Sequence, residues 1–176
     1  CRDIAQKFNN DYQIENFFTV PEPLIKKEFS RIMSLKDGLK KMSKSEVSDL
    51  SRINLTDDKD LIVNKIKRAK TDTLPLPSTS VDLEKRPEAK NLMGIYSSLL
   101  DINLEETINK FSEKNFSELK ENLSQVMVDK ICPISLEIKK LLSEKKYLDK
   151  ILLEGTQKAD KIASEKVKKI QELVGF

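Results

Sequence analysis

The sequence predicts the end of an α/β domain, followed by a C-terminal bundle of helices. Two short apolar runs, at residues 17–20 and 31–35, have the length of strands, and Pro21 and Pro23 bound the first run. From residue 56 onwards the apolar residues recur at helical spacing instead. Because isolated short strands are not stable, we expect the rest of their sheet to lie outside this chain. The predicted division is an α/β part at residues 1–56 and a helical part at residues 57–176.

An amphipathic helix is expected at the start of the chain. Ile4, Ala5 and Phe8 fall on one face of residues 1–9, and the Asn and Asp residues at 9–11 would end the helix. Cys1 stands inside this helical pattern. We therefore expect the chain to be a piece of a longer polypeptide.

The first helix of the helical part is expected to begin near Thr56 or Asp57, either of which can cap it. Its apolar positions include Leu61, Ile62 and Ile66, and it would stop before the prolines at 75 and 77. Residues 73–85 have no periodicity and predict a loop. Pro87 is typical of the first turn of the next helix.

Two capping boxes mark further helix starts, because Asn103 and Asn115 are each followed three residues later by a glutamate. Pro133 interrupts the long helical pattern that begins after Asn115, and it should kink that helix or divide it in two. A final helix is predicted from about Tyr147 towards Val174.

Composition sets broad limits on function. The chain has 38% hydrophobic and 35% charged residues and a net charge of +3, which permits a polyanionic partner without requiring one. Residues 26–70 hold 13 Lys or Arg against 7 Asp or Glu, whereas residues 101–176 hold 14 of each. Two cysteines and no histidine predict no protein-bound metal site and a reducing compartment. No apolar run approaches the roughly 18 residues of a membrane span.

The positive excess surrounds the segment Lys41-Met42-Ser43-Lys44-Ser45. Two ammonium groups and two hydroxyls within five residues can bind the phosphates of a nucleotide. Lysine suits a mobile phosphate clamp because its compact charge sits on a flexible stem. The alternative is a solvated surface pair, which is the usual role of lysines at this spacing.

This segment reads KMSKS, the signature of class I aminoacyl-tRNA synthetases, and its surroundings resemble the tryptophanyl family of these enzymes. The resemblance extends over essentially the whole chain. The segments that match in order and spacing are residues 31–37, 41–45, 51–58, 65–72, 86–92, 95–96 and 174–176.

The resemblance implies that residues 1–56 end a Rossmann-like catalytic domain and that residues 57–176 are of the tRNA anticodon-binding type. It implies ATP with Mg²⁺, L-tryptophan and tRNA(Trp) as substrates, a homodimer, and a location in the cytoplasm or an organelle matrix. Lys44 would be the main contact to the leaving pyrophosphate, with Lys41 helping. Met42, Ser43 and Ser45 would shape the ATP-binding loop. The backbone of Ile32 would lie against the adenine.

The chain also departs from the family pattern. Glu46-Val47 follows the lysine-rich segment where the family usually has Asp-Pro, and Gly38 stands where the family often has proline. The family places a histidine-bearing ATP motif and the tryptophan pocket upstream of Cys1, and the chain has no histidine. We therefore expect this chain alone to be inactive. The alternatives are a truncated, non-catalytic helical module that binds RNA or protein, and a structural helical protein with a fortuitous loop.

Overall fold

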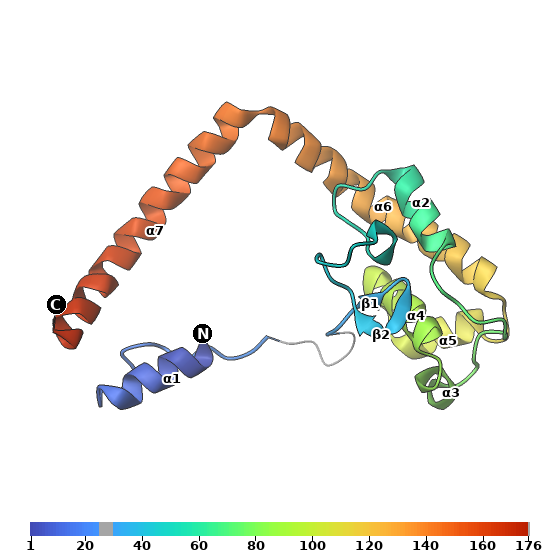
Figure 1. Cartoon of the computed structure of the whole chain (residues 1–176), viewed down its shortest axis with the longest axis horizontal. Helices are drawn as coiled ribbons and strands as arrows, with labels where there is room; N and C mark the ends of the chain where they lie inside the picture. The colour runs from blue at the N-terminus through green and yellow to red at the C-terminus, as the bar shows by residue number, and fades with distance from the viewer. Residues whose placement is uncertain (25–29, 176) are drawn as a thin grey trace. The chain divides into compact units, whose positions relative to one another are not determined.

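The computed structural model describes residues 1–24 and 30–175, which divide into two units. Unit 1 joins Cys1–Lys26 to Glu144–Phe176, and unit 2 is Lys27–Ser143. Figure 1 colours the chain from blue to red, so unit 1 carries both ends of the colour range. The predicted boundary after residue 56, between an α/β part and a helical part, stays a prediction.

The strands of the described residues form one small antiparallel hairpin in unit 2. Strand β1 (Met33–Ser34) pairs with β2 (Asp37–Lys41), with Met33 opposite Lys41 and Ser34 opposite Asp37. The register is irregular between Met33 and Ser34. The apolar run at 31–35 therefore contributes a strand, as the sequence predicted, and its partner is the segment that leads into Lys41.

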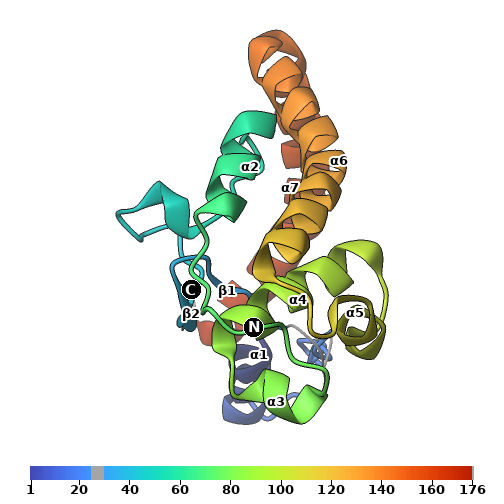
Figure 2. The same ribbon diagram turned by 90° about the vertical axis from the view of Figure 1, so that its right-hand side faces the viewer.

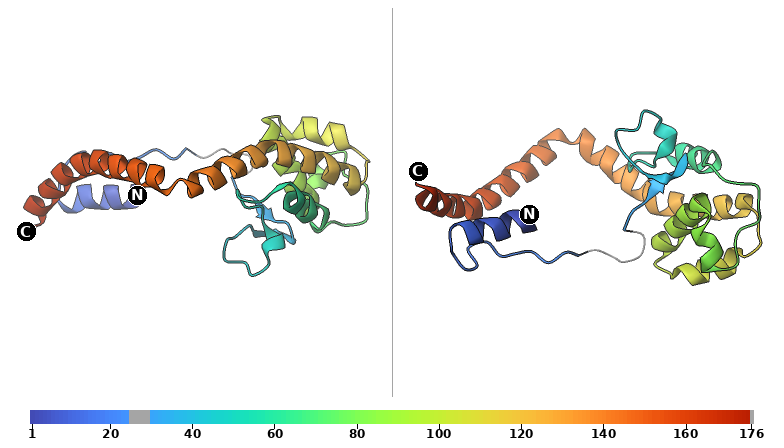
Figure 3. Two further views of the ribbon diagram at one scale, coloured as in Figure 1. Left: turned by 90° about the horizontal axis from the view of Figure 1, so that it is seen from above. Right: turned by 60° about the horizontal axis from the view of Figure 1, so that its bottom comes forward.

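The other regular elements in the described residues of unit 2 are helices. They are the short 3₁₀ turn η1 (Asp49–Ser51), α2 (Lys59–Lys67), α3 (Ser80–Glu84), α4 (Pro87–Leu100), α5 (Leu104–Phe111) and α6 (Phe116–Ser143). Both α2 and α4 pack against α6, as Figures 2 and 3 show from different directions. Their apolar faces close a core centred on fully buried Ile62, Ile66, Met93 and Leu119.

Local signals account for most of the helix starts. The side chain of Asn103 accepts a hydrogen bond from Glu106 N–H at 2.8 Å, and Asn115 accepts one from Glu118 N–H at 3.0 Å, which confirms both predicted caps. Pro87 occupies the first turn of α4 as predicted. The prediction for α2 was wrong by a residue, because Asp58 is its cap and accepts from Leu61 N–H at 2.9 Å.

Two other predictions fail for identifiable reasons. Residues 73–85 are not all loop, because Thr79 caps the five-residue helix α3 and places Leu83 in the core. Of the two outcomes expected at Pro133, the division of the helix is wrong, because α6 continues through Pro133 to Ser143, and the kink stays a prediction. Proline removes one backbone hydrogen bond there. The turns before it are held by buried Leu119 and Leu123, so the helix survives the loss.

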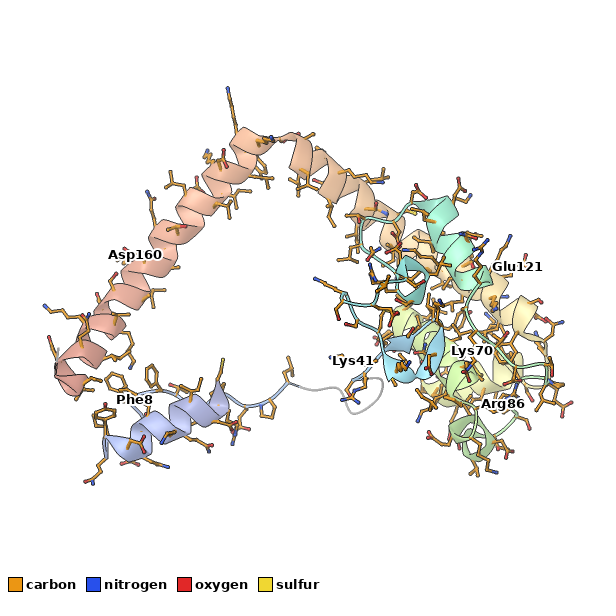
Figure 4. The ribbon with its side chains drawn as sticks, viewed as in Figure 1. Phe8, Lys41, Lys70, Arg86, Glu121 and Asp160 are labelled. Atoms are coloured by element: carbon orange, nitrogen blue, oxygen red, sulfur yellow. The ribbon has the colours of Figure 1, made fainter. Side chains whose placement is uncertain are left out.

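Unit 1 consists of α1 (Arg2–Asp11), α7 (Lys145–Val174) and the segment that follows α1. The rings of Phe17 and Phe18 lie 5.3 Å and 5.0 Å from that of Phe8, which Figure 4 labels on α1. The Lys166 ammonium of α7 lies 3.8 Å from the centre of the Phe17 ring. None of the described helices combines the length and apolarity that a membrane span requires.

The strand predicted at residues 17–20 does not form. The Asn9 side chain meets both backbone groups of Phe18, donating to its carbonyl at 2.8 Å and accepting from its N–H at 2.9 Å. One amide side chain thus provides the hydrogen bonds that a neighbouring strand would provide.

Candidate functional site

A cavity of about 600 Å³ opens where the hairpin runs into the loop that follows it. Five of the six residues predicted to bind ATP line this cavity, namely Ile32, Lys41, Met42, Ser43 and Lys44. The other residues that line it are Ser30, Arg31, Arg52, Ile53, Asn54 and Leu55. The structure therefore brings the lysine-rich loop together with Ile32, which lies nine residues before Lys41.

Ser45, the sixth candidate, closes the loop from within. Its hydroxyl lies 2.8 Å from that of Ser43, and its N–H donates to the Ser43 hydroxyl at 3.3 Å. These bonds make a compact turn of the kind that serine side chains form with nearby backbone. Ser45 is thus part of the turn that contains Lys44.

The two lysines are available to a ligand. Both are exposed, and neither forms an ion pair within residues 1–24 and 30–175. Figure 4 labels Lys41 at the end of β2, where the strand leaves the hairpin. Two unneutralised ammonium groups at the rim of one cavity attract an anion such as a phosphate.

Helix α4 fixes the hairpin that carries one wall of the cavity. Asn91, which is 6% exposed, accepts from Met33 N–H at 2.9 Å and donates to the Met33 carbonyl at 2.8 Å. Directly after β2, Met42 N–H donates to the Ile32 carbonyl at 3.0 Å. The backbone of Ile32 is thereby held between the loop and a residue anchored to the core.

Gly38 lies in β2 against the first turn of α4. A Cβ atom there would come within 2.7 Å of Glu88 N and of the Pro87 carbonyl carbon. The glycine is thus a close-contact position, where the first turn of α4 leaves no room for a side chain. The ion pair between Lys70 and Glu88, at 2.8 Å, ties the same turn to the end of α2.

The loop that follows Ser45 is held by Arg52. Its guanidinium donates to the Glu46 carbonyl at 2.8 Å and to Asn54 Oδ1 at 3.2 Å, and it pairs with Asp49 at 3.1 Å. A hydrogen bond from Lys65 and one from Asn54 lower the pKa of Asp49 below its ordinary value, so this carboxylate is ionised at neutral pH.

Sequence reasoning assigned no role to Arg52, Asn54 or Asn91. The resemblance includes all three residues in its matching segments. No local pattern identifies Asn91, because its partner Met33 lies 58 residues away on another element. The partners of Arg52 and Asn54 lie within six residues, but their contacts follow no standard spacing such as that of a helix cap.

The arrangement suits an anionic ligand with an apolar part. Lysines and hydroxyls occupy the loop side of the cavity, while half-buried Ile32, Met42 and Ile53 offer apolar surface. A nucleotide has this division between phosphates and base. Among residues 1–24 and 30–175, no three His, Cys, Asp or Glu side chains gather as metal ligands would.

Comparison with known proteins identifies a family and similar sequences. The family described as tRNA synthetases class I (W and Y) matches residues 1–131. A tryptophan–tRNA ligase from Rickettsia felis is 49% identical over 175 residues, covering 99% of this chain and 52% of its own length. One from Brucella melitensis is 43% identical over 193 residues, covering 99% of this chain and 54% of its own length.

Solved structures agree. A tryptophanyl-tRNA synthetase from Mycoplasma pneumoniae superposes with a TM-score of 0.79 at 25% identity, over 99% of this chain and 51% of its own. The Campylobacter jejuni enzyme, solved with ADP and tryptophan, gives a TM-score of 0.65 at 28% identity, over 99% of this chain and 52% of its own. The chain spans about half the length of the curated relatives that it matches. It belongs to the class I tRNA synthetases, in the family of the tryptophan and tyrosine enzymes.

Proposed function

We propose that this chain supplies the ATP phosphate-binding loop and the helical part of a tryptophan–tRNA ligase. Such an enzyme joins L-tryptophan to tRNA(Trp) through a tryptophanyl-adenylate. The observation that carries the proposal is the cavity at the end of the hairpin, where Ile32 and both lysines of the loop meet. The choice of tryptophan within the family is supported by the names of the relatives at 42–49% identity.

The activation step needs positive charge more than it needs a base. The carboxylate of the amino acid attacks the α-phosphate of ATP and expels pyrophosphate, and a carboxylate has no proton to remove. Charge builds up on the departing β- and γ-phosphates, so catalysis requires cations that bind them better in the transition state than in the ground state. Lys44 takes this role, and Lys41 assists from the end of β2.

The remaining candidates position the nucleotide. The backbone of Ile32, already held by Met42 and the Asn91–Met33 contacts, lies against the adenine. Met42, Ser43 and Ser45 give the loop its shape and offer hydrogen bonds to the phosphates. Mg²⁺ enters with the nucleotide, since this ion is usually bound through substrate phosphates and retains several waters.

The helices and the whole assembly complete the proposal. We assign tRNA(Trp) as the partner of the helical part, with its anticodon the portion received there, and a homodimer as the complete enzyme, located in the cytoplasm. The excess of Lys and Arg at residues 26–70 is compatible with a polyanionic substrate near the loop.

This chain alone should not activate tryptophan. It contributes one side of the ATP site, and no histidine is present for the family's other ATP motif. The purified chain should therefore show no tryptophan-dependent exchange of pyrophosphate into ATP. Measurable exchange by the chain alone would contradict this part of the proposal.

The roles of the lysines are tested in the native polypeptide that contains this chain. Lys44→Ala should lower tryptophan-dependent exchange by about 100- to 1,000-fold, the loss typical of removing one transition-state contact. Lys41→Ala should have a smaller effect. The matched control is Lys59→Ala, on the exposed first turn of α2. Unchanged exchange in Lys44→Ala would refute the assignment of the loop.

A further inference from the structure

Buried Lys65 is the centre of a cluster of charged side chains that contacts the candidate loop through Arg52. Lys65, on α2, is 1% exposed, and its ammonium lies 2.6 Å from an oxygen of Asp49 and 2.6 Å from one of Asp57. The Asp57 side chain is also buried, and it accepts from Asn54 N–H at 2.9 Å. Taking a lysine this far from water is unfavourable unless it is paired, and here two carboxylates pair with it.

Arg52 connects this cluster to the loop. One arm of its guanidinium pairs with Asp49 at 3.1 Å, and the other donates to the Glu46 carbonyl at 2.8 Å. Glu46 immediately follows Ser45. An unbroken line of contacts therefore runs from Lys65, through Asp49 and Arg52, to the backbone at the end of the lysine-rich segment.

A contribution to the stability of the fold does not by itself explain this cluster well. Well-packed apolar residues often stabilise a core as well as a buried ion pair does, whereas an ion pair imposes a specific geometry. The geometry imposed here is that of a loop whose own two lysines form no ion pair among the described residues. Arg52 thus anchors the backbone next to this segment without using either of its lysines.

We propose that Arg52 and Lys65 are positioning residues for the phosphate-binding loop. They hold the arm after Ser45 so that Lys44 faces the cavity, which Arg52 also lines. This inference rests on the proposed function, because it takes Lys44 to be the group that contacts the pyrophosphate. Arg52 itself acts through Lys44, since its nitrogens are already engaged by Glu46, Asp49 and Asn54.

A double-mutant cycle in the native polypeptide tests this dependence. Arg52→Lys keeps the charge and loses the planar fork that reaches both Asp49 and Glu46. A misplaced loop should lower tryptophan-dependent exchange by about 10- to 100-fold. If Arg52 works by placing Lys44, Arg52→Lys combined with Lys44→Ala should be no slower than Lys44→Ala alone. Arg68→Lys, an exposed change at the end of α2, is the matched control and should match wild type.

The exchange rates of these variants distinguish the positioning role of Arg52 from the proposed function of the loop. Wild-type exchange in Arg52→Lys, or losses that multiply in the double mutant, would overturn the positioning role while leaving the loop assignment intact. Full exchange in Lys44→Ala would overturn both. Lys65→Met enters the same cycle and should also be non-additive with Lys44→Ala. If Lys65→Met does not fold, the Arg52→Lys result decides alone.

Discussion

Replacing Gly38 with alanine should destabilise unit 2, whereas the same replacement at Gly155 should stabilise α7. The added Cβ at Gly38 would lie 2.7 Å from Glu88 N, 2.7 Å from the Pro87 carbonyl carbon and 2.9 Å from the Pro87 carbonyl oxygen. These are backbone atoms of the first turn of α4, so they cannot rotate away. At Gly155 the added atom would meet nothing within 4 Å.

The expected magnitudes follow from these surroundings. Forcing one extra carbon into a filled contact costs about 1–3 kcal/mol of unfolding free energy. With a urea dependence of about 2 kcal/mol per M, the midpoint of unit 2 should fall by about 0.5–1.5 M. Alanine in place of glycine inside an exposed helix should gain about 0.5–1 kcal/mol. The same substitution is thus expected to lower the free energy of unfolding at Gly38 and to raise it at Gly155.

The assay is hydrogen exchange measured by mass spectrometry across a urea series, because it reads peptides from α4 and α7 separately. The α4 peptides should lose protection at lower urea in Gly38→Ala, and the α7 peptides should retain it to higher urea in Gly155→Ala. An unchanged or raised midpoint for α4 in Gly38→Ala would refute the close-contact argument. A lowered midpoint for α7 in Gly155→Ala would refute the open-helix argument.

Three further predictions concern single polar side chains. Asn91→Ala should lower the free energy of unfolding by about 1–3 kcal/mol, because it leaves both backbone groups of Met33 unpaired. An unchanged urea midpoint would show that the Asn91 side chain does not stabilise the hairpin. Asn103→Ala should cost about 1 kcal/mol through loss of the α5 cap, and early exchange of the first α5 amides would reveal it; wild-type protection there would count against the cap. Because its pKa is lowered in the folded chain, mainly by the Lys65 hydrogen bond, Asp49 should stabilise the fold above its ordinary pKa of 3.8 and lose this contribution as the pH falls through the lowered value. Between pH 6 and pH 2, the urea midpoint of Asp49→Asn should therefore fall less steeply than that of the wild type. Parallel plots of midpoint against pH for the two proteins would contradict this contribution of Asp49.

The features that sequence predicted correctly depend on residues close together in the chain. The Asn103 and Asn115 caps each act on the backbone three residues later. The KMSKS signature at residues 41–45, which indicated the family, is likewise one continuous string. Such signals are complete within a few residues, so no knowledge of the fold is needed to recognise them.

The features that sequence missed depend on side-chain contacts that no standard local pattern marks. The run at residues 17–20 has strand-like residues, yet the Asn9 side chain occupies the backbone groups that a strand would use. From sequence alone, Lys65 resembles any lysine on an exposed helix face. The structure shows it paired with two aspartates. Arg52 contacts Glu46 and Asp49, which are close to it in sequence, but only the folded loop shows which nearby groups its guanidinium reaches.

If this chain is the phosphate-binding part of an enzyme that activates tryptophan, the native polypeptide that contains it must catalyse ATP–pyrophosphate exchange with that amino acid. The decisive assay compares exchange with tryptophan and exchange with tyrosine, the two substrates of the family. We predict exchange that depends on tryptophan, and no exchange with tyrosine alone. Exchange driven by tyrosine, or by neither amino acid, would contradict the proposed function.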